Sequence, residues 1–223
     1  MATESRRRGS SGGTGRQART RLARAAVIQA ARALFVERGY AATTIEAVSE
    51  RSDVPPATVY RLFSSKLGIL KELVDVSIAG DDEAVPLADR PHIRELLADP
   101  DPRSQLSGFA GITCGIMSRT EPVHRILVSA AGSDPDAAAL LAEQTRHRQQ
   151  GQGQIAGLLA REGALRPELS ERDAADIIHA LMSPEVYRLL VGDRGWDPER
   201  YEQWLKGTLI GQLLSTSTSQ TSA

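Results

Sequence analysis

The sequence has little of what disulfides and membrane spans need. It contains one cysteine, Cys114, among 223 residues, so no disulfide can form within the chain, which is typical of a reducing compartment. Its longest apolar stretch, residues 108–117, is about half of the roughly 20 residues that a spanning helix requires. The N-terminal arginines are followed by no apolar segment of the kind found in a signal peptide. We therefore expect a cytoplasmic protein.

The sequence is also poor in the residues that favour β-structure. Aromatic residues make up 4% of the chain, and few segments are rich in β-branched residues, whereas Ala, Leu, Arg and Glu are abundant. These are helix formers, so an all-α fold is predicted. The hydrophobic fraction of 41% is enough to bury a sizeable core, in one large domain or in one small and one larger domain.

The charge is unevenly divided along the chain. The net charge is −1, but residues 1–80 hold 13 basic and 7 acidic residues, whereas residues 81–223 hold 14 and 21. A basic N-terminal third suggests that a polyanion meets this end of the protein. A basic disordered tail would give the same excess of positive charge, since most of the arginines that produce this excess lie within residues 6–24.

Composition also predicts the domain limits. Residues 1–18 are rich in Gly, Ser and Arg and should form a disordered basic arm, and the polar segment 216–223 should form a disordered tail. Between them we predict a small helical domain over residues 19–65 and a larger one over residues 66–215.

In the small domain, apolar residues at three- and four-residue spacing predict a helix over residues 20–38, which Gly39 would end. Thr43 and Glu46 have the spacing of a capping box that opens a short helix reaching about residue 51. Pro56 would then begin a second short helix.

In the larger domain, Ser64 or Ser65 should cap a helix over residues 66–79. Ser170 with Asp173, and Asp197 before a proline, mark further helix starts, and Pro184 should kink the helix that contains it. The remaining helices are predicted over residues 92–98, 102–119, 121–131, 135–162, 171–191 and 198–214.

Residues 43–63 form two short helices joined by a tight turn, which is the helix-turn-helix pattern. With Val59, Leu62 and Phe63 packed inward, the second helix presents a polar outer face. On that face Arg61 can bind guanine and Thr58 can contact a thymine. The residues expected to bind double-stranded DNA are Arg21, Thr43, Thr44, Pro55, Pro56, Ala57, Thr58, Tyr60, Arg61 and Lys66.

The segment TTIEAVSERSDVPPATVYRLFSSKLGIL, residues 43–70, resembles the signature of the TetR family of transcriptional regulators. Residues 174–209 more weakly resemble the pair of helices through which family members dimerise. The resemblance implies a homodimer, a palindromic operator, a helix-turn-helix domain over residues 19–65 and a ligand-binding and dimerisation domain over residues 66–215. The matching positions of the signature are Thr43, Thr44, Ile45, Val54, Thr58, Tyr60, Phe63, Ser65 and Lys66.

Three departures from the family pattern affect the DNA-binding segment. Asp53 replaces the usual turn glycine, and Asp tolerates left-handed geometry better than most residues. Pro55 and Pro56 stand where polar residues are common, so Pro56 offers no hydrogen bond to a base. Leu67 replaces an acidic residue, which weakens the favourable charge at that helix start.

The resemblance places the ligand pocket among the middle helices, where the scarcity of charge favours an apolar or neutral effector. The candidate ligand-binding residues are Phe109, Thr113, Cys114, Met117, His124, Gln144, His147, His179, Met182 and Tyr187. The candidate dimer-interface residues are Ile178, Leu181, Leu189, Tyr201, Trp204, Leu205, Thr208, Leu209 and Gln212. Each residue in these sets is also compatible with an ordinary place in the core or on the surface.

The resemblance implies a repressor that a small molecule releases from DNA, and we expect no enzyme. The four histidines are scattered, Cys114 has no partner cysteine, and no catalytic or metal-binding motif is present, so we expect no cofactor and no metal. One alternative is a non-specific DNA-packaging protein, against which the acidic remainder of the chain argues. Another is a regulator that senses a protein partner.

Overall fold

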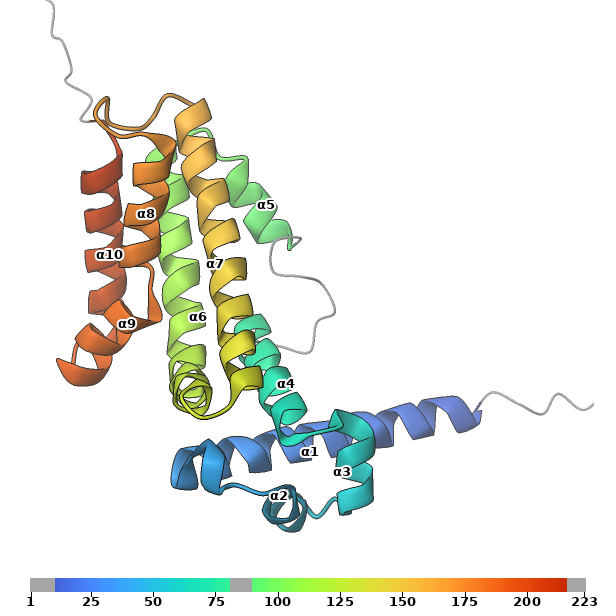
Figure 1. Ribbon diagram of the computed structural model, residues 1–223. Coiled ribbons are helices and arrows are strands. Elements are labelled where there is room, and N and C mark those ends of the chain that lie inside the picture. Colours follow the sequence, from blue (N-terminus) through green and yellow to red (C-terminus); the bar gives the residue numbers. More distant parts are fainter. Residues whose placement is uncertain (1–10, 81–89, 216–223) are drawn as a thin grey trace, which may run out of the picture. The chain divides into compact units, whose positions relative to one another are not determined.

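The computed structural model describes residues 11–80 and 90–215, which form helices and the turns between them (Figure 1). Within these ranges there is no strand, apart from one isolated antiparallel bridge between Leu165 and Leu214. The predicted all-α fold is confirmed. The elements are α1 (Ser11–Ala42), α2 (Ile45–Ser52), α3 (Pro56–Phe63), α4 (Lys66–Ala79), α5 (Pro91–Leu97), α6 (Pro102–Ala131), α7 (Pro135–Arg161), α8 (Glu171–Leu181), α9 (Pro184–Tyr187), the π-helix η2 (Arg188–Asp193) and α10 (Pro198–Leu213).

The chain divides into two compact units between Leu73 and Val74, inside α4. The predicted domain boundary stood at the start of this helix. Much of the predicted N-terminal arm and the whole predicted tail, residues 1–10 and 216–223, lie outside the described residues, as do residues 81–89 of the acidic connection.

The first helix is longer than predicted. It begins at Ser11, so residues 11–18, which were expected to be disordered, are helical. Arg16, Gln17 and Arg19 are good helix formers, and extending an existing helix adds one hydrogen bond for each residue that is fixed. The side chain of Arg19 also donates to the carbonyl oxygen of Gly15, one turn earlier, at 3.3 Å.

The turn between α1 and α2 departs from the predicted capping box. Gly39 has φ 80° and interrupts α1 as expected. The N-cap of α2 is Thr44, whose hydroxyl accepts from the backbone N–H of Ala47 at 3.1 Å, and not Thr43. The hydroxyl of Thr43 instead donates to the carbonyl of Gly39 at 2.8 Å. The predicted pairing of Thr43 with Glu46 was therefore wrong by one residue.

The turn between α2 and α3 has the predicted left-handed residue. Asp53 adopts φ 54° and ψ 31°, and its N–H bonds to carbonyls of the last turn of α2. The hydroxyl of Ser49 donates to the carbonyl of Val54 at 2.6 Å, and Pro56 begins α3. The angle between the two helices is thereby fixed by local hydrogen bonds and by the restricted backbone of proline.

The core of the first unit is a small apolar cluster among its helices. Ala31, Leu34 and Phe35 on α1, Val48 on α2 and Val59 on α3 are all buried. Leu62, which was predicted to be buried, is half-exposed, whereas Phe63 is buried. A buried face on α3 leaves its other face available to a ligand.

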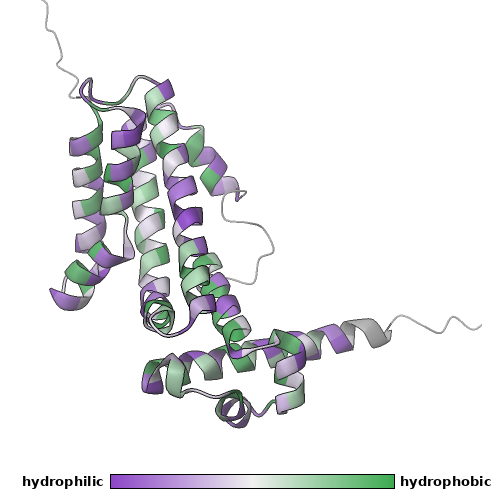
Figure 2. Ribbon diagram, viewed as in Figure 1, coloured by the Kyte–Doolittle hydropathy of each residue, from purple (hydrophilic) through white to green (hydrophobic). Residues whose placement is uncertain are grey.

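In the second unit, α6, α7, α8 and α10 pack side by side (Figure 1). Apolar and polar residues alternate along α8 and α10 (Figure 2), as expected of helices with one buried face. On α10, Tyr201, Leu205, Leu209 and Leu213 recur every fourth residue and are all fully buried. They form one continuous core with residues of α6, α7 and α8.

Two helix boundaries were wrongly predicted at prolines. Residues 102–119 and 121–131 belong to one helix, α6, with Pro122 inside it. Pro122 leaves the carbonyl of Ser118 without its helical donor, and Ser118 is exposed to water that can replace that donor. Pro184 begins α9 and does not kink a longer helix, because Ser183 caps this turn by accepting from Val186 N–H at 3.2 Å. The predicted starts at Ser170 and Asp197 are confirmed.

Candidate DNA interface and effector pocket

The outer face of α3 carries the residues that were predicted to read DNA. Val59 and Phe63 are buried, whereas Ala57, Tyr60 and Arg61 are exposed. Thr58 is half-buried. Pro55 and Pro56 are exposed at the start of the helix. An exposed arginine and a threonine on a short, firmly packed helix suit the floor of a DNA major groove, where bidentate arginine–guanine contacts are the commonest specific contact.

A groove in the first unit brings α1 and α3 together around basic side chains. Its volume is about 690 Å³, and it is lined by Arg16, Arg19, Thr20, Ala23, Thr58, Arg61 and Leu62. Among these lining residues there are three arginines and no acidic side chain. Because guanidinium groups bind phosphate oxygens through two parallel hydrogen bonds, the groove is suited to the phosphate backbone beside the bases that α3 would contact. Arg21, also predicted to bind DNA, is exposed on α1.

The structure separates the predicted DNA-binding residues of the α1–α2 turn. Thr44 is exposed, and it stands at the N-terminus of α2, where backbone N–H groups favour an anion. Thr43 is 1% exposed, and its hydroxyl bonds to the backbone. Thr43 therefore holds the turn, and the phosphate contact of Thr44 stays a prediction.

Lys66 was predicted to bind phosphate, but its ammonium group lies among carbonyl oxygens of the α1–α2 turn. Nζ donates to the carbonyls of Tyr40 at 2.8 Å and Thr43 at 2.9 Å, and a longer contact joins it to Ala41 at 3.5 Å. It also lies 4.3 Å from the centroid of the Tyr40 ring. Because these contacts use its donors, Lys66 acts by shaping the turn.

Arg24 has a structural role that the sequence analysis did not single out. It donates to the carbonyl of Leu62 at 3.0 Å, pairs with Glu72 and lies over the ring of Phe63. It thereby links α1 to the end of α3 and to α4. The sequence could have indicated this role, because Arg24 lies one helical turn before the buried Val27 and Ile28 and so borders the apolar face of α1.

In the second unit, six of the predicted ligand-binding residues are part of the core. Phe109, Thr113, Cys114, Met117, Met182 and Tyr187 are all buried. The thiol of Cys114 donates to the carbonyl of Pro198 at 3.3 Å, and burial raises the pKa of this thiol. A protonated, buried thiol is a poor nucleophile.

A second group of predicted residues belongs to a polar cluster among α6, α7, α8 and α9. His179 Nδ1 lies 2.8 Å from Gln152 Oε1, and Gln152 donates to the carbonyl of Met182 at 3.4 Å. His124 Nε2 lies 3.6 Å from a carboxylate oxygen of Glu185. Burial lowers the pKa of His124. Gln144 is half-buried and His147 is exposed, both on α7.

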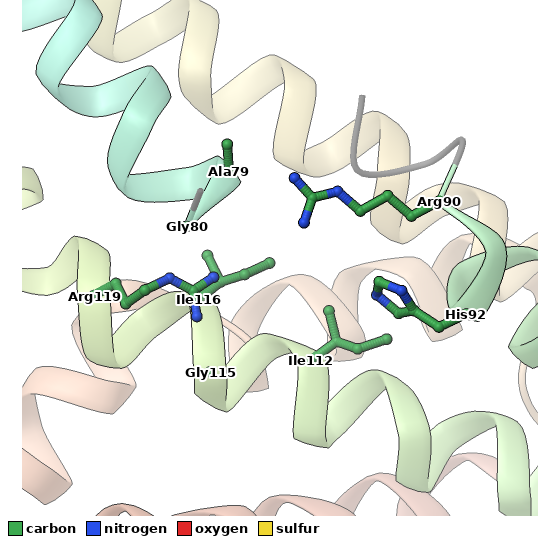
Figure 3. A pocket seen from close by; sticks show the side chains of 8 residues that line it. All are labelled: Ala79, Gly80, Arg90, His92, Ile112, Gly115, Ile116 and Arg119. Carbon is green, nitrogen blue, oxygen red and sulfur yellow. The ribbon is translucent and has the colours of Figure 1, made fainter. Parts of the chain in front are cut away.

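A separate pocket of about 270 Å³ opens where the end of α4 and the start of α5 meet α6 (Figure 3). Its lining residues were not predicted, and they are Ala79, Gly80, Arg90, His92, Ile112, Gly115, Ile116 and Arg119. Arg119 is far in sequence from Arg90 and His92, and no motif marked the three as neighbours.

Comparison with known proteins agrees with the helix-turn-helix geometry. Residues 27–73 match the model of the bacterial regulatory proteins of the tetR family. This match covers the described helix-turn-helix segment, and two curated transcriptional regulators are similar to a larger part of the chain. The chain is 31% identical over 158 residues to the transcriptional regulator TcmR of Streptomyces glaucescens, covering 66% of this chain and 64% of that protein. It is 28% identical over 172 residues to the uncharacterized regulator YdeS of Bacillus subtilis, covering 74% and 77%.

Among solved structures, the fold is similar to that of NalD from Pseudomonas aeruginosa, with a TM-score of 0.69 and 22% identity over 89% of this chain and 99% of that one. NalD is described as the secondary repressor of a multidrug efflux pump. The chain is thus a helix-turn-helix transcriptional regulator. In its described residues no helix is long and apolar enough to cross a membrane, and no cluster of His, Cys, Asp or Glu could hold a metal ion.

The structure divides the predicted dimer-interface residues of this regulator into two sets. Ile178, Tyr201, Leu205 and Leu209 are fully buried within one protomer. Leu181, Trp204 and Thr208 are half-buried, and Leu189 and Gln212 are exposed. The second set therefore remains accessible to a partner subunit. Gly207 and Gly211 also lie on α10, and a Cβ atom built at either position would meet no atom within 4 Å.

Proposed function

We propose that this regulator is a homodimeric repressor that binds a palindromic operator in the bacterial cytoplasm and leaves it when a small molecule binds. The observation that carries the proposal is the outer face of α3, where Arg61 and Thr58 line one groove with the arginines of α1. This arrangement offers base-reading and phosphate-binding groups together. NalD, which shares the fold, is itself described as a repressor.

The proposal includes a dimer because one short recognition helix contacts few base pairs. Two-fold dimers read two half-sites about 34 Å apart, one turn of the double helix. We propose that the accessible faces of α8 and α10 form the interface. Trp204 and Thr208 offer contact surface there, and Gly207 and Gly211 allow a partner helix to approach closely.

Release by a ligand requires that the ligand bind the DNA-competent and the released conformations with different affinities. The helix α4 begins among residues of the first unit and ends at Ala79 and Gly80, which line the pocket of the second. A ligand that changes how α4 ends is therefore able to alter the DNA-bound state. By linkage, operator and ligand then weaken each other's binding by the same factor.

The test is selection of the full-length protein on a library of random duplexes, followed by titration of the enriched sequence against salt. We expect a palindrome and a steep loss of affinity with salt. The variant Arg61→Ala should lose preference at defined positions of each half-site, whereas Arg172→Ala, an exposed position on α8, should not.

Two outcomes would refute the proposal. Tight binding without any enriched sequence would indicate a packaging protein, and no binding would reject the DNA-binding face described above. A regulator that senses a protein would bind the palindrome but would not be released by any small molecule of a broad library.

A further inference from the structure

The carboxyl end of α3, the helix proposed to contact bases, is held by a side chain of α1. Nη2 of Arg24 donates to the carbonyl oxygen of Leu62 at 3.0 Å, and the guanidinium carbon lies 5.1 Å from the centroid of the Phe63 ring. The last carbonyls of a helix have no donor within it, and a cation there also interacts favourably with the helix dipole. Arg24 therefore caps α3, although it lies 38 residues earlier in the chain.

This cap matters because α3 is short. It has eight residues, and a helix of that length is not stable by itself, so its direction depends on what its two ends contact. At its start, Pro55 is the N-cap and offers no side-chain hydrogen bond to the first turn. At its end, Ser64 adopts φ 64°, a conformation that costs free energy for a residue with a Cβ atom. Contacts from outside the helix are therefore needed to hold this end in place.

A second contact fixes the guanidinium itself. A carboxylate oxygen of Glu72 on α4 accepts from Nη1 of Arg24, while Nη2 bonds to the carbonyl of Leu62. Because a guanidinium is a planar fork of rigid donors, two acceptors on different helices set both its position and its plane. The side chains of Arg24 and Glu72 are 39% and 29% exposed, so water screens this pair less than a pair on the open surface.

The start of α4 lies directly against the same end of α3. A Cβ atom at Gly68 would overlap the carbonyl oxygen of Phe63, so glycine is needed for this close approach. Residues 66–73 of α4 belong to the same compact unit as α1 and α3. Glu72 therefore stands on a segment whose place beside α3 is fixed, and through its ion pair it fixes the place of Arg24.

The residues proposed to contact bases lie next to the bond that Arg24 makes. Arg61 precedes Leu62 in the chain, Thr58 lies one helical turn before Leu62, and all three line the same groove. A contact of Arg61 with guanine requires two hydrogen bonds at once, and a shift of about 0.5 Å or a tilt of roughly 10–20° disturbs such a geometry. A loosened α3 would therefore lose discrimination between bases, whereas attraction to phosphates depends mainly on charge.

Arg24 is itself a poor candidate for a phosphate contact. Its charge is paired with Glu72, and it does not line the groove that contains Arg16 and Arg19. No acidic side chain is among the described residues that line this groove. Arg16 and Arg19 are thus the better phosphate ligands, and Arg24 is expected to affect DNA binding through α3.

We propose that Arg24 is a positioning residue for operator recognition. It fixes the direction of α3 through the carbonyl of Leu62 and the ring of Phe63, and Glu72 of α4 keeps it in that place. The pair thereby sets the selectivity between bases without touching DNA, and it leaves the phosphate contacts of α1 unchanged. The inference rests on the proposed binding of bases by α3.

The test measures full-length variants on the selected palindrome and on its single-base variants, over a range of salt. Arg24→Gln should lower the preference for the palindrome roughly fivefold or more, at the base pairs that Arg61→Ala also relaxes. Affinity for unrelated duplexes and the slope against salt should not change, since no phosphate contact is removed. The double variant Arg24→Gln/Arg61→Ala should relax these base pairs no further than Arg61→Ala, because both changes act through one contact.

A second variant changes the partner of Arg24. Glu72→Gln keeps the shape of the side chain and removes its charge, so it should shift selectivity at the same base pairs by a smaller factor. Because Arg24 keeps its contacts with α3 in this variant, it tests the proposal even where Arg24→Gln unfolds. The matched control is Arg51→Gln, which breaks an ion pair with Glu37 that joins α2 to α1 and not to α3. This control should leave selectivity unchanged.

Hydrogen exchange without DNA gives an independent readout of α3. The N–H of Ser64 bonds to the carbonyl of Tyr60 at 2.8 Å in the last turn of this helix. In Arg24→Gln the amides of residues 62–64 should exchange faster, whereas those of α2 should exchange as in the unmodified protein. An equal loss of affinity for all duplexes would indicate a merely structural role, and a reduced slope against salt would make Arg24 a phosphate ligand. Either result would overturn the proposal.

The role of Arg24 and the proposed function can fail separately. An unmodified protein that enriches no sequence would refute the proposed function and, with it, the role of Arg24. A selective unmodified protein whose Arg24→Gln variant is equally selective would refute the role of Arg24 alone.

Discussion

Lys66 Nζ donates to the carbonyl oxygen of Thr43 at 2.9 Å, and so ties the start of α4 to the turn that precedes α2. The family signature contains both residues, and sequence reasoning assigned both to DNA. In the fold the two residues instead contact each other. Lys66 also donates to the carbonyl of Tyr40 and lies over the ring of this tyrosine. The turn positions Thr44 and the N-terminus of α2, so we expect Lys66 to affect DNA binding through the conformation of this turn.

Replacing Lys66 by methionine should destabilise the protein without removing any contact between a basic side chain and a DNA phosphate. The change leaves the carbonyls of Tyr40 and Thr43 without their charged donor, at a cost of about 1–3 kcal/mol. We expect a lower midpoint of urea unfolding and weaker operator binding with an unchanged slope against salt. Lys71→Met, at an exposed position on α4, is the matched control. A salt slope reduced in Lys66→Met would restore Lys66 as a phosphate ligand.

Arg19 and Arg61 should differ in how they contribute to DNA binding, although both line the same groove. Arg19→Ala should weaken binding to all duplexes alike and reduce the salt slope by about one per protomer, as expected of a phosphate contact. Arg61→Ala should relax selection at one base pair of each half-site, by about 1–3 kcal/mol. Affinities measured on the palindrome and on single-base variants, over a range of salt, separate these effects. Equal losses on all sequences for Arg61→Ala would exclude it from base reading.

Gly207→Leu should dissociate the dimer and leave the protomer folded. A Cβ atom at this position would meet no atom of its own chain within 4 Å, and leucine is the better helix former by roughly 0.8 kcal/mol. On the proposed interface, however, the added side chain would hold two α10 helices apart. Sedimentation equilibrium should show monomers for Gly207→Leu and dimers for Gly151→Leu, whose position on α7 is equally open. A Gly207→Leu dimer of normal affinity would place the interface elsewhere.

Stability should fall as the pH drops below the ordinary range of histidine. Burial lowers the pKa of His124 in the folded protein below its usual value of 6.5; Glu185 and Glu121 oppose the shift and Arg148 adds to it. Burial also lowers the pKa of His179. Between the folded and unfolded pKa values, the unfolded chain binds more protons, so acid favours unfolding, and the loss levels off once the folded pKa is passed.

Melting temperatures measured from about pH 8 to pH 5 test this expectation. The variant His124→Gln should show a shallower decline than the unmodified protein, and His147→Gln, at an exposed position on α7, should show the same decline. A profile for His124→Gln that coincides with that of the unmodified protein would mean that this histidine does not couple protonation to folding.

The amino-acid sequence by itself determined those features that depend on residues close together in the chain. The all-α fold, the left-handed Asp53, the capping of α8 by Ser170 and the buried Val59 and Phe63 of α3 all follow from composition, from spacing of three or four residues, or from hydrogen bonds within one turn. The same local information identified the helix-turn-helix segment and hence the family.

The tertiary structure decided what depends on residues far apart in the chain. The role of Lys66 depends on carbonyls more than 20 residues earlier. The burial of Tyr201 and Leu205 depends on α6 and α8 packing against α10. The pocket at the end of α4 is lined by Arg90 and Arg119, which lie on separate helical elements and far apart in the chain. Sequence periodicity shows which face of a helix is apolar, but packing alone determines whether that face meets its own chain, a partner or a ligand.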